Sequence, residues 1–226
     1  MRHYLGLSAC MLLVALPTAW AAGGAPMSTP HMDSHQSPQD QAKSAYNHGV
    51  GDVHKADKYQ TSAAEASDDK KKDKALHEAQ EYYTSALNSF TQAVKADPNM
   101  HEAWNYVGYT NRKLGHYDVA LQAYERALTL HPGYPEALEY RGEAFLGLNR
   151  VSDAEQAYLD LFASNRALAD KLLVAMKGWI TAQRGPAAGS ADATAVDALD
   201  KWVQERTQIA AQTASLTRVG AASSWR

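Results

Sequence analysis

Four residues near the N-terminus, Met27, His31, Met32 and His35, carry the side chains that best suit metal chemistry, because thioether and imidazole ligands favour copper. They lie within residues 22–40, a stretch rich in Gly, Pro and Ser without periodicity. This composition predicts a flexible leader, in which scattered His and Met more often have no ligand role. Copper handling through the leader is therefore kept as an alternative function.

Motifs for catalysis are absent from the sequence. The chain has no P-loop, no Gly-x-Gly-x-x-Gly, no His-Glu-x-x-His and no Gly-x-Ser-x-Gly. His48 and His54 are six residues apart, a spacing that does not place them on one helix face. The only cysteine, Cys10, lies in a segment that is predicted to be removed. The sequence therefore indicates a protein that is not an enzyme and that needs no cofactor or metal ion.

Three acidic residues have a spacing that suits binding. Glu136, Glu139 and Glu143 are three and four residues apart, so a helix places them on one face. Like charges on one face repel one another, although Arg112 or Arg141 could offset part of the repulsion. A basic or amphipathic partner segment would relieve it. With a formal charge of −3 over 226 residues, the composition gives no reason to expect a nucleic acid as the partner.

An internal repeat predicts the helices that carry these residues. Residues 101–134 and 135–168 match at a spacing of 34. The matched pairs include Glu102 with Glu136, Tyr106 with Tyr140, Gly108 with Gly142, and Tyr124 with Tyr158. A fixed period of this length is typical of stacked helical repeats. One unit cannot bury its own apolar stripe, so neighbouring units must stack.

These spacings resemble the tetratricopeptide repeat (TPR), a helix–turn–helix unit. The first copy of the family's pattern falls on Trp104, Val107, Gly108, Asn111, Ala120, Tyr124, Ala127 and Pro132. The second copy falls on Leu138, Arg141, Gly142, Phe145, Ala154, Tyr158 and Leu161. Asn111 departs from the usual aromatic residue, and Tyr109 or Tyr117 is expected to fill that space. The resemblance implies an all-α solenoid of about three helix–turn–helix units that binds protein partners.

The resemblance also implies where a partner binds. Ligand contacts in the family come from fixed positions of the first helix of each unit, and these helices line the concave side. In this chain those positions are Asn47, Asn105, Tyr109, Arg112, Lys113, Glu136, Glu139, Glu143 and Leu146. The sequence therefore predicts a partner segment bound in a concave groove.

The first unit is predicted over residues 41–98 as an expanded repeat. Ala45–Asn47 parallels Ala103–Asn105, but the second helix of the unit does not follow directly. Residues 59–75 intervene and include a run of Asp and Lys whose charges nearly cancel, which indicates a solvated insert. The alternative is one long helix from about Ser62 to Ala96.

The remaining elements follow from local signals. Gly115 is expected to supply the left-handed residue after the first helix of the second unit, and Pro132 is expected to end its second helix. Trp104, Trp179 and Trp202 are expected to be core anchors. The predicted units are TPRs at 101–134 and 135–164, C-terminal capping helices at 165–215 and a flexible tail at 216–226.

Residues 1–21 are predicted to be a secretory signal peptide. A short basic start precedes an apolar run from Leu5 to Leu16, and Ala19-Trp20-Ala21 forms a cleavage site. The apolar run is too short to span a membrane. Together with the repeats, this segment predicts a protein of the bacterial periplasm, or a secreted one, that acts as a scaffold or adaptor. A structural subunit of an envelope complex is a further alternative.

Overall fold

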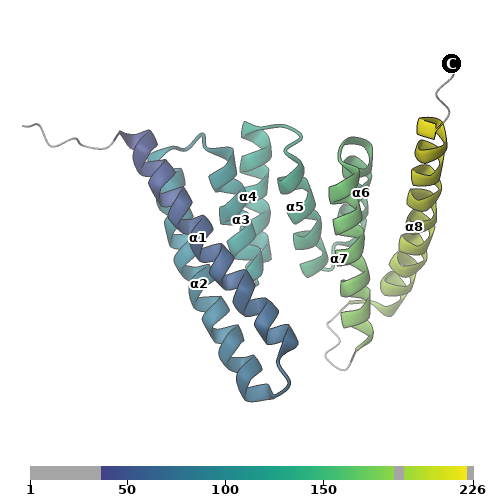
Figure 1. Cartoon of the computed structure of the whole chain (residues 1–226), viewed down its shortest axis with the longest axis horizontal. Helices are drawn as coiled ribbons and strands as arrows, with labels where there is room; N and C mark the ends of the chain where they lie inside the picture. The colour runs from purple at the N-terminus through teal and green to yellow at the C-terminus, as the bar shows by residue number, and fades with distance from the viewer. Residues whose placement is uncertain (1–36, 186–190, 223–226) are drawn as a thin grey trace, which may run out of the picture. The chain divides into compact units, whose positions relative to one another are not determined.

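The computed structural model describes residues 37–185 and 191–222, with side chains described as far as residue 213. This part of the chain contains eight α-helices and no β-strand (Figure 1). The helices are α1 (Pro38–Glu65), α2 (Asp69–Ala96), α3 (His101–Lys113), α4 (Tyr117–Leu130), α5 (Pro135–Gly147), α6 (Val151–Ser164), α7 (Arg166–Arg184) and α8 (Ala193–Ala222). The predicted all-α helical-repeat fold is confirmed. The predicted signal peptide and residues 22–36 of the predicted leader lie outside the described residues.

The helices pack in pairs, and the pairs stack in chain order (Figure 1). Within the pairs, α1 packs along α2, α3 along α4, and α5 along α6. Contacts of α2 with α3 and of α4 with α5 join each pair to the next. The first helices of successive pairs also meet, because α3 contacts α5 and α5 contacts α7. This stacking buries the apolar stripe that a single unit leaves exposed.

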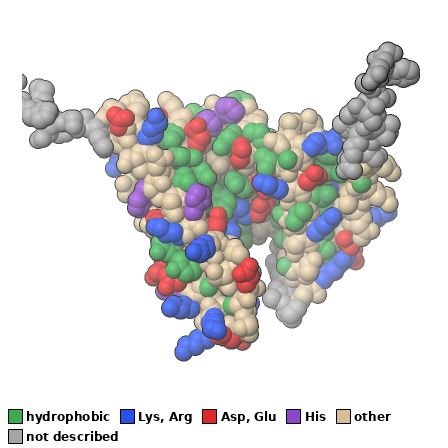
Figure 2. Space-filling view, viewed as in Figure 1, with side chains coloured by type: hydrophobic (Ala, Val, Ile, Leu, Met, Phe, Trp, Pro, Cys, Tyr) green, Lys and Arg blue, Asp and Glu red, His purple; other side chains and the backbone are tan. Residues whose placement is uncertain are grey.

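The first pair is longer than the others. α1 and α2 each have 28 residues, against 13 in α3. Residues 59–75 continue α1 and open α2, so the alternative of a single helix from Ser62 to Ala96 is wrong. The reason is a strong helix start: the Asp68 carboxylate accepts a hydrogen bond from the Lys71 backbone N–H at 2.9 Å. Figure 2 shows charged side chains of both signs at this end of the α1–α2 hairpin, as expected for a solvated surface.

At its other end, α1 begins inside the predicted leader. Ser37 caps the helix, with its Oγ accepting a hydrogen bond from the Asp40 backbone N–H at 3.1 Å. Pro38 follows at the first helical position, where its missing N–H has no cost. The predicted boundary of the leader at residue 40 is therefore too late.

Local signals end the helices of the repeats where expected. Gly115 follows α3 with a φ of 83°, in the left-handed region. After α5 the equivalent residue is Asn149, which takes the same conformation with a φ of 58°. The second helix of the unit, α4, stops at Leu130, just before Pro132.

Aromatic rings pack on glycine where the two helices of a unit cross. Phe90 and Tyr124 are 34 residues apart in the sequence, and both are fully buried. A Cβ added to Gly49 would lie 2.8 Å from Cε1 of Phe90, and one added to Gly108 would come within 3.0 Å of the Tyr124 ring. The same close approach thus recurs in the first and second units, and it requires a residue without a side chain.

The tryptophans are less buried than predicted. Trp104, Trp179 and Trp202 are half-buried at the edges of the core. Trp104 Nε1 donates a hydrogen bond to the Pro98 carbonyl at 3.0 Å, and Trp202 stands edge-on against Tyr158 with ring centroids 5.2 Å apart. An indole N–H needs an acceptor, which favours a position at the edge of a core. The prediction that these residues are core anchors is wrong in this respect.

The C-terminal helices extend further than predicted. α7 buries the predicted apolar face, which includes Leu168, Leu172, Met176 and Ile180. α8 continues to Ala222, so the prediction of a flexible tail is wrong for residues 216–222, while 223–226 lie outside the described residues. No proline interrupts α8, and its first glycine is Gly220. Within the described part of the chain, no helix is both long and apolar enough to cross a membrane.

Gly108→Ala is expected to lower the free energy of unfolding by about 1–3 kcal/mol, because the new Cβ would overlap the buried Tyr124 ring. Gly178 on α7 is the matched control, since a Cβ there meets no atom within 4 Å. Gly178→Ala is expected to raise the free energy of unfolding by about 0.5–1 kcal/mol through helix propensity. Urea denaturation of both variants measures the difference, and equal effects would contradict the close crossing at Gly108.

Candidate functional site

The first helices α1, α3, α5 and α7 share a common surface, which we call the groove face. We define it by the residues Asp57, Gln60, Tyr109, Arg112, Lys113, Glu139, Tyr140, Glu143, Lys171 and Val174. Two pockets open on this face. The Lys113 pocket has a volume of about 290 Å³, and Gln60, Arg112, Lys113, Glu143, Leu146 and Trp179 line it. The Val174 pocket has a volume of about 450 Å³ between α5 and α7, and Glu139, Glu143, Lys171 and Val174 line it.

An ion pair between α3 and α5 lies on the groove face. Arg112 donates a short hydrogen bond to the Glu143 carboxylate, and the arginine side chain is only 11% exposed. Its guanidinium also lies over the rings of Tyr109 and Tyr140, 5.3 and 5.4 Å from their centroids. The Nε atom of Arg112 is buried and has no hydrogen-bond partner among the described residues. The pair therefore joins two repeats while one of its donors stays unused.

Glu139 is a buried carboxyl, 4% exposed, on the same helix as Glu143. Burial, together with the negative charge of Glu143, raises the pKa of Glu139 to about 8. Arg112 and Lys171 act in the opposite direction but do not outweigh burial. Glu139 is therefore protonated at neutral pH. The predicted repulsion among the glutamates is largely relieved inside the protein, because Glu139 is neutral and Glu143 is paired.

Lys113 and Asp57 tie α3 to α1. The hydroxyls of Tyr83 and Tyr109 both donate hydrogen bonds to Asp57, the one from Tyr109 at 2.8 Å. Lys113 donates a short hydrogen bond to Oε1 of Gln60, and its ammonium lies 5.4 and 5.8 Å from the centroids of the same two tyrosine rings. Burial lowers the pKa of Lys113.

The structure brings most of the predicted partner-binding residues together. Those that meet on the groove face or line its pockets are Tyr109, Arg112, Lys113, Glu139, Glu143 and Leu146. Glu136 is half-buried in the first turn of α5, and its charge acts on Tyr134 and Tyr106 rather than on this cluster. Asn105 is 2% exposed and belongs to the interior.

Asn47 does not take the place that its predicted equivalence to Asn105 implies. It is exposed, whereas its neighbour Tyr46 packs against Phe90 and Tyr106, with ring centroids 5.7 Å away in both cases. Gly49 lies against Phe90 as Gly108 lies against Tyr124. If Gly49 corresponds to Gly108, then the residue that corresponds to Asn105 is Tyr46, one position before Asn47.

Five residues of the groove face are not predicted by the sequence: Asp57, Gln60, Tyr140, Lys171 and Val174. Tyr140 could have been found from the sequence, because it lies 34 residues after Tyr106 and so occupies the same position of the repeat. Gln60 lies within the predicted solvated insert and Asp57 just before it, and Lys171 lies in the predicted capping helices. Only the packing of α1 and α7 against the middle of the solenoid shows that these residues face the site.

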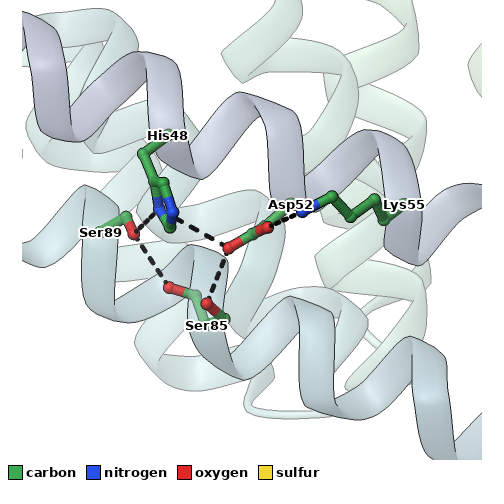
Figure 3. Close-up of polar contacts among 5 residues, drawn as sticks. All are labelled: His48, Asp52, Lys55, Ser85 and Ser89. Carbon is green, nitrogen blue, oxygen red and sulfur yellow. Dashed lines mark hydrogen bonds and ion pairs between the residues drawn. The ribbon is translucent and has the colours of Figure 1, made fainter.

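A second polar group joins α1 to α2 (Figure 3). Asp52 is buried and accepts hydrogen bonds from Lys55 Nζ at 2.9 Å and from Ser85 Oγ at 2.7 Å. His48 Nδ1 lies 3.0 Å from Ser89 Oγ and 3.7 Å from Asp52 Oδ2. Burial alone would raise the pKa of Asp52, but the hydrogen bonds from Lys55 and Ser85 hold it below its usual value.

This group shares only its composition with a hydrolase triad. In a Ser-His-Asp triad the serine and the aspartate contact different ring nitrogens, so that the imidazole passes a proton between them. Here Ser89 and Asp52 both face Nδ1 of His48 (Figure 3). The arrangement cannot relay a proton in that way, and its effect is to hold α1 against α2.

Side chains that could bind a metal ion do not cluster in the described part of the chain. Among the described residues, no group of three or more His, Cys, Asp or Glu side chains could hold a metal ion. His101 and His131 stack with ring centroids 4.6 Å apart, which is a packing contact between two helix ends. The Met27, His31, Met32 and His35 set lies outside the described residues.

A comparison with known protein families agrees with this architecture. A family model described as tetratricopeptide repeat matches residues 76–135 and, a second time, residues 110–169. The two matches begin 34 residues apart, which is the period of the internal repeat. Between them they span part of α2 and the two helix pairs from α3 to α6, which contain the crossing at Gly108 and the left-handed residues Gly115 and Asn149. Residues 76–169 of this chain are therefore tetratricopeptide repeats.

Proposed function

We propose that the protein is a scaffold or adaptor of the bacterial periplasm whose groove face binds a segment of a partner protein. Tetratricopeptide repeats support a general role in protein–protein interaction. Export is supported by the sequence of residues 1–21, with its short apolar run and Ala19-Trp20-Ala21 site. The described part of the chain supplies the binding surface.

The observation that carries this proposal is the cluster of buried ionisable side chains on the groove face. A buried ion pair is often no more stable than apolar packing of the same volume, so Arg112 and Glu143 have no evident structural advantage here. A strongly shifted pKa beside a surface pocket is typical of a functional site, and Glu139 shows one, while burial also lowers the pKa of Lys113. Because α1, α3, α5 and α7 all contribute, a segment in the groove would contact every unit.

An amphipathic partner segment suits this surface better than a uniformly basic one. Val174 is 67% exposed and lines a pocket beside Glu139 and Lys171. Glu143 is already paired with Arg112, so the groove face is not a simple acidic surface. A segment that places apolar side chains on α7 and polar ones along α3 and α5 would therefore match it.

Photo-crosslinking in the native envelope tests the proposal. The crosslinking residue p-benzoylphenylalanine is placed at Val174 on the groove face or, as a matched control, at Val119 on α4, a second helix outside the groove face. Both valines are exposed, at 67% and 49%. A discrete partner is expected to crosslink in the periplasmic fraction from position 174 and not from 119. Crosslinking from neither position, or equally from both, would contradict the groove as the binding site.

A further inference from the structure

Lys113 is a partly buried cation that forms no ion pair with the described residues, although the charges of Asp57 and Glu143 act on it from a greater distance. Its one hydrogen bond is to the neutral Oε1 of Gln60, and no carboxylate oxygen of the described residues lies within 4.0 Å of its ammonium. An ammonium group has three N–H donors, so this bond leaves two unused. A desolvated cation with free donors gains much from an anion that reaches it.

Arg112 also lines this pocket and has a donor that no described residue uses. Its Nε atom is buried without a hydrogen-bond partner, while its terminal nitrogen holds Glu143. Glu143, the acid that lines this pocket, already accepts from Arg112, and the nearby Asp57 accepts from two tyrosine hydroxyls. The free hydrogen-bonding capacity of the Lys113 pocket is therefore on the donor side.

The rest of the pocket is apolar. Leu146 and Trp179 line it from α5 and α7, and Tyr117 closes it from the start of α4. Trp179 is only half-buried, so its ring keeps an open surface toward the pocket. A side chain entering here would meet donors on one wall and aromatic or aliphatic carbon on the other.

We propose that the Lys113 pocket is a subsite for an acidic side chain of the partner segment, with a bulky apolar side chain of the same segment resting on Trp179. This inference rests on the proposed function and adds the chemistry of one contact to it. The carboxylate would accept hydrogen bonds from Lys113 and Arg112. Charge-assisted bonds of this kind are stronger in a partly buried site than at the surface.

The subsite depends on the expanded first unit. Gln60 lies in the second half of the 28-residue α1 and reaches Lys113, which is 53 residues away in the sequence. The first helices of the next two units have only 13 residues each. The added length of α1 thus supplies the residue that positions Lys113.

Selection of random 12-residue peptides tests the subsite. The peptides are displayed on phage through their C-termini, selected on the purified chain and then synthesised with amidated C-termini, so that only side chains can supply a carboxylate. Dissociation constants are measured for the original protein, for Lys113→Met, and for Lys177→Met as a control at an exposed lysine of α7. Lys113→Met is expected to keep the melting temperature, because an apolar side chain replaces an unpaired cation.

The expected result is that groove-binding peptides contain Asp or Glu beside a bulky apolar residue. Lys113→Met should weaken them by about tenfold or more, the size expected for one charged hydrogen bond, while Lys177→Met should not. Exchanging the peptide's Glu for Gln should weaken its binding to the original protein by the same factor. The same exchange should not weaken its binding to Lys113→Met any further. This coupling separates a direct contact from a general charge effect.

Two failures are distinguishable. If no enriched peptide is blocked by Val174→Trp, which fills the groove face, then the proposed function is wrong and the subsite with it. If such peptides are enriched but lack an acidic residue, or bind Lys113→Met as tightly as the original protein, then the groove binds partners and the assignment of the Lys113 pocket is wrong.

Discussion

Arg112→Ala is expected to lower the free energy of unfolding by about 3–5 kcal/mol, the range for removing one member of a buried ion pair. The side chain is 11% exposed and holds Glu143 from the neighbouring repeat. Without it, Glu143 would face the Glu139 carboxyl with no bound cation. The rings of Tyr109 and Tyr140 would also lose the guanidinium that lies over them. Guanidinium chloride denaturation of the original protein and the variant measures the loss.

Arg184 provides the matched control. Like Arg112, it forms ion pairs, in this case with two carboxylates, Asp197 at 2.5 Å and Asp200 at 2.7 Å. Its side chain, however, is 47% exposed. Solvent screens such pairs, so Arg184→Ala is expected to lower the free energy of unfolding far less than Arg112→Ala does. Equal losses for the two arginines would contradict the burial of the Arg112 pair.

Glu139 is expected to make the protein less stable as pH rises from about 4.5 to about 8. In the unfolded chain the carboxyl loses its proton near pH 4.5, whereas in the folded protein its pKa is about 8. The folded state therefore binds more protons than the unfolded state across this window, and the free energy of unfolding falls as pH rises through it. This shift corresponds to a loss of about 5 kcal/mol at most, which should level off above the folded pKa.

Glu139→Gln isolates this effect. The amide keeps the size of the side chain and cannot ionise, so the slope of stability against pH between about 4.5 and 8 should disappear in the variant. Arg112, Glu143 and Lys171 remain as in the original protein, so their contributions cancel in the comparison. Urea denaturation at a series of pH values measures both curves. Parallel curves would show that Glu139 is ionised in the folded protein at neutral pH.

The helices of the second and third units could be predicted from the sequence because their signals are local. A left-handed residue such as Gly115 and a proline such as Pro132 end a helix through their own backbone geometry. The 34-residue period, carried by pairs such as Gly108 with Gly142, then implies stacking. The first unit was harder, because the cap residue Asp68 lies in a run of Asp and Lys that a continuous helix could also contain.

The spacing of Glu136, Glu139 and Glu143 determines which face of α5 they share, but it does not determine what packs on that face. Only the assembled helices decide that Glu139 is buried and neutral, and that Glu143 is bound to Arg112, 31 residues away. The meeting of Gln60 with Lys113 likewise depends on how α1 lies against α3. The sequence alone determined the repeat, the helix ends and the face on which the polar residues lie, since these depend on backbone conformation and period. Tertiary packing decided their exposure, charge state and partners, because each of these is a property of groups brought together from distant parts of the chain.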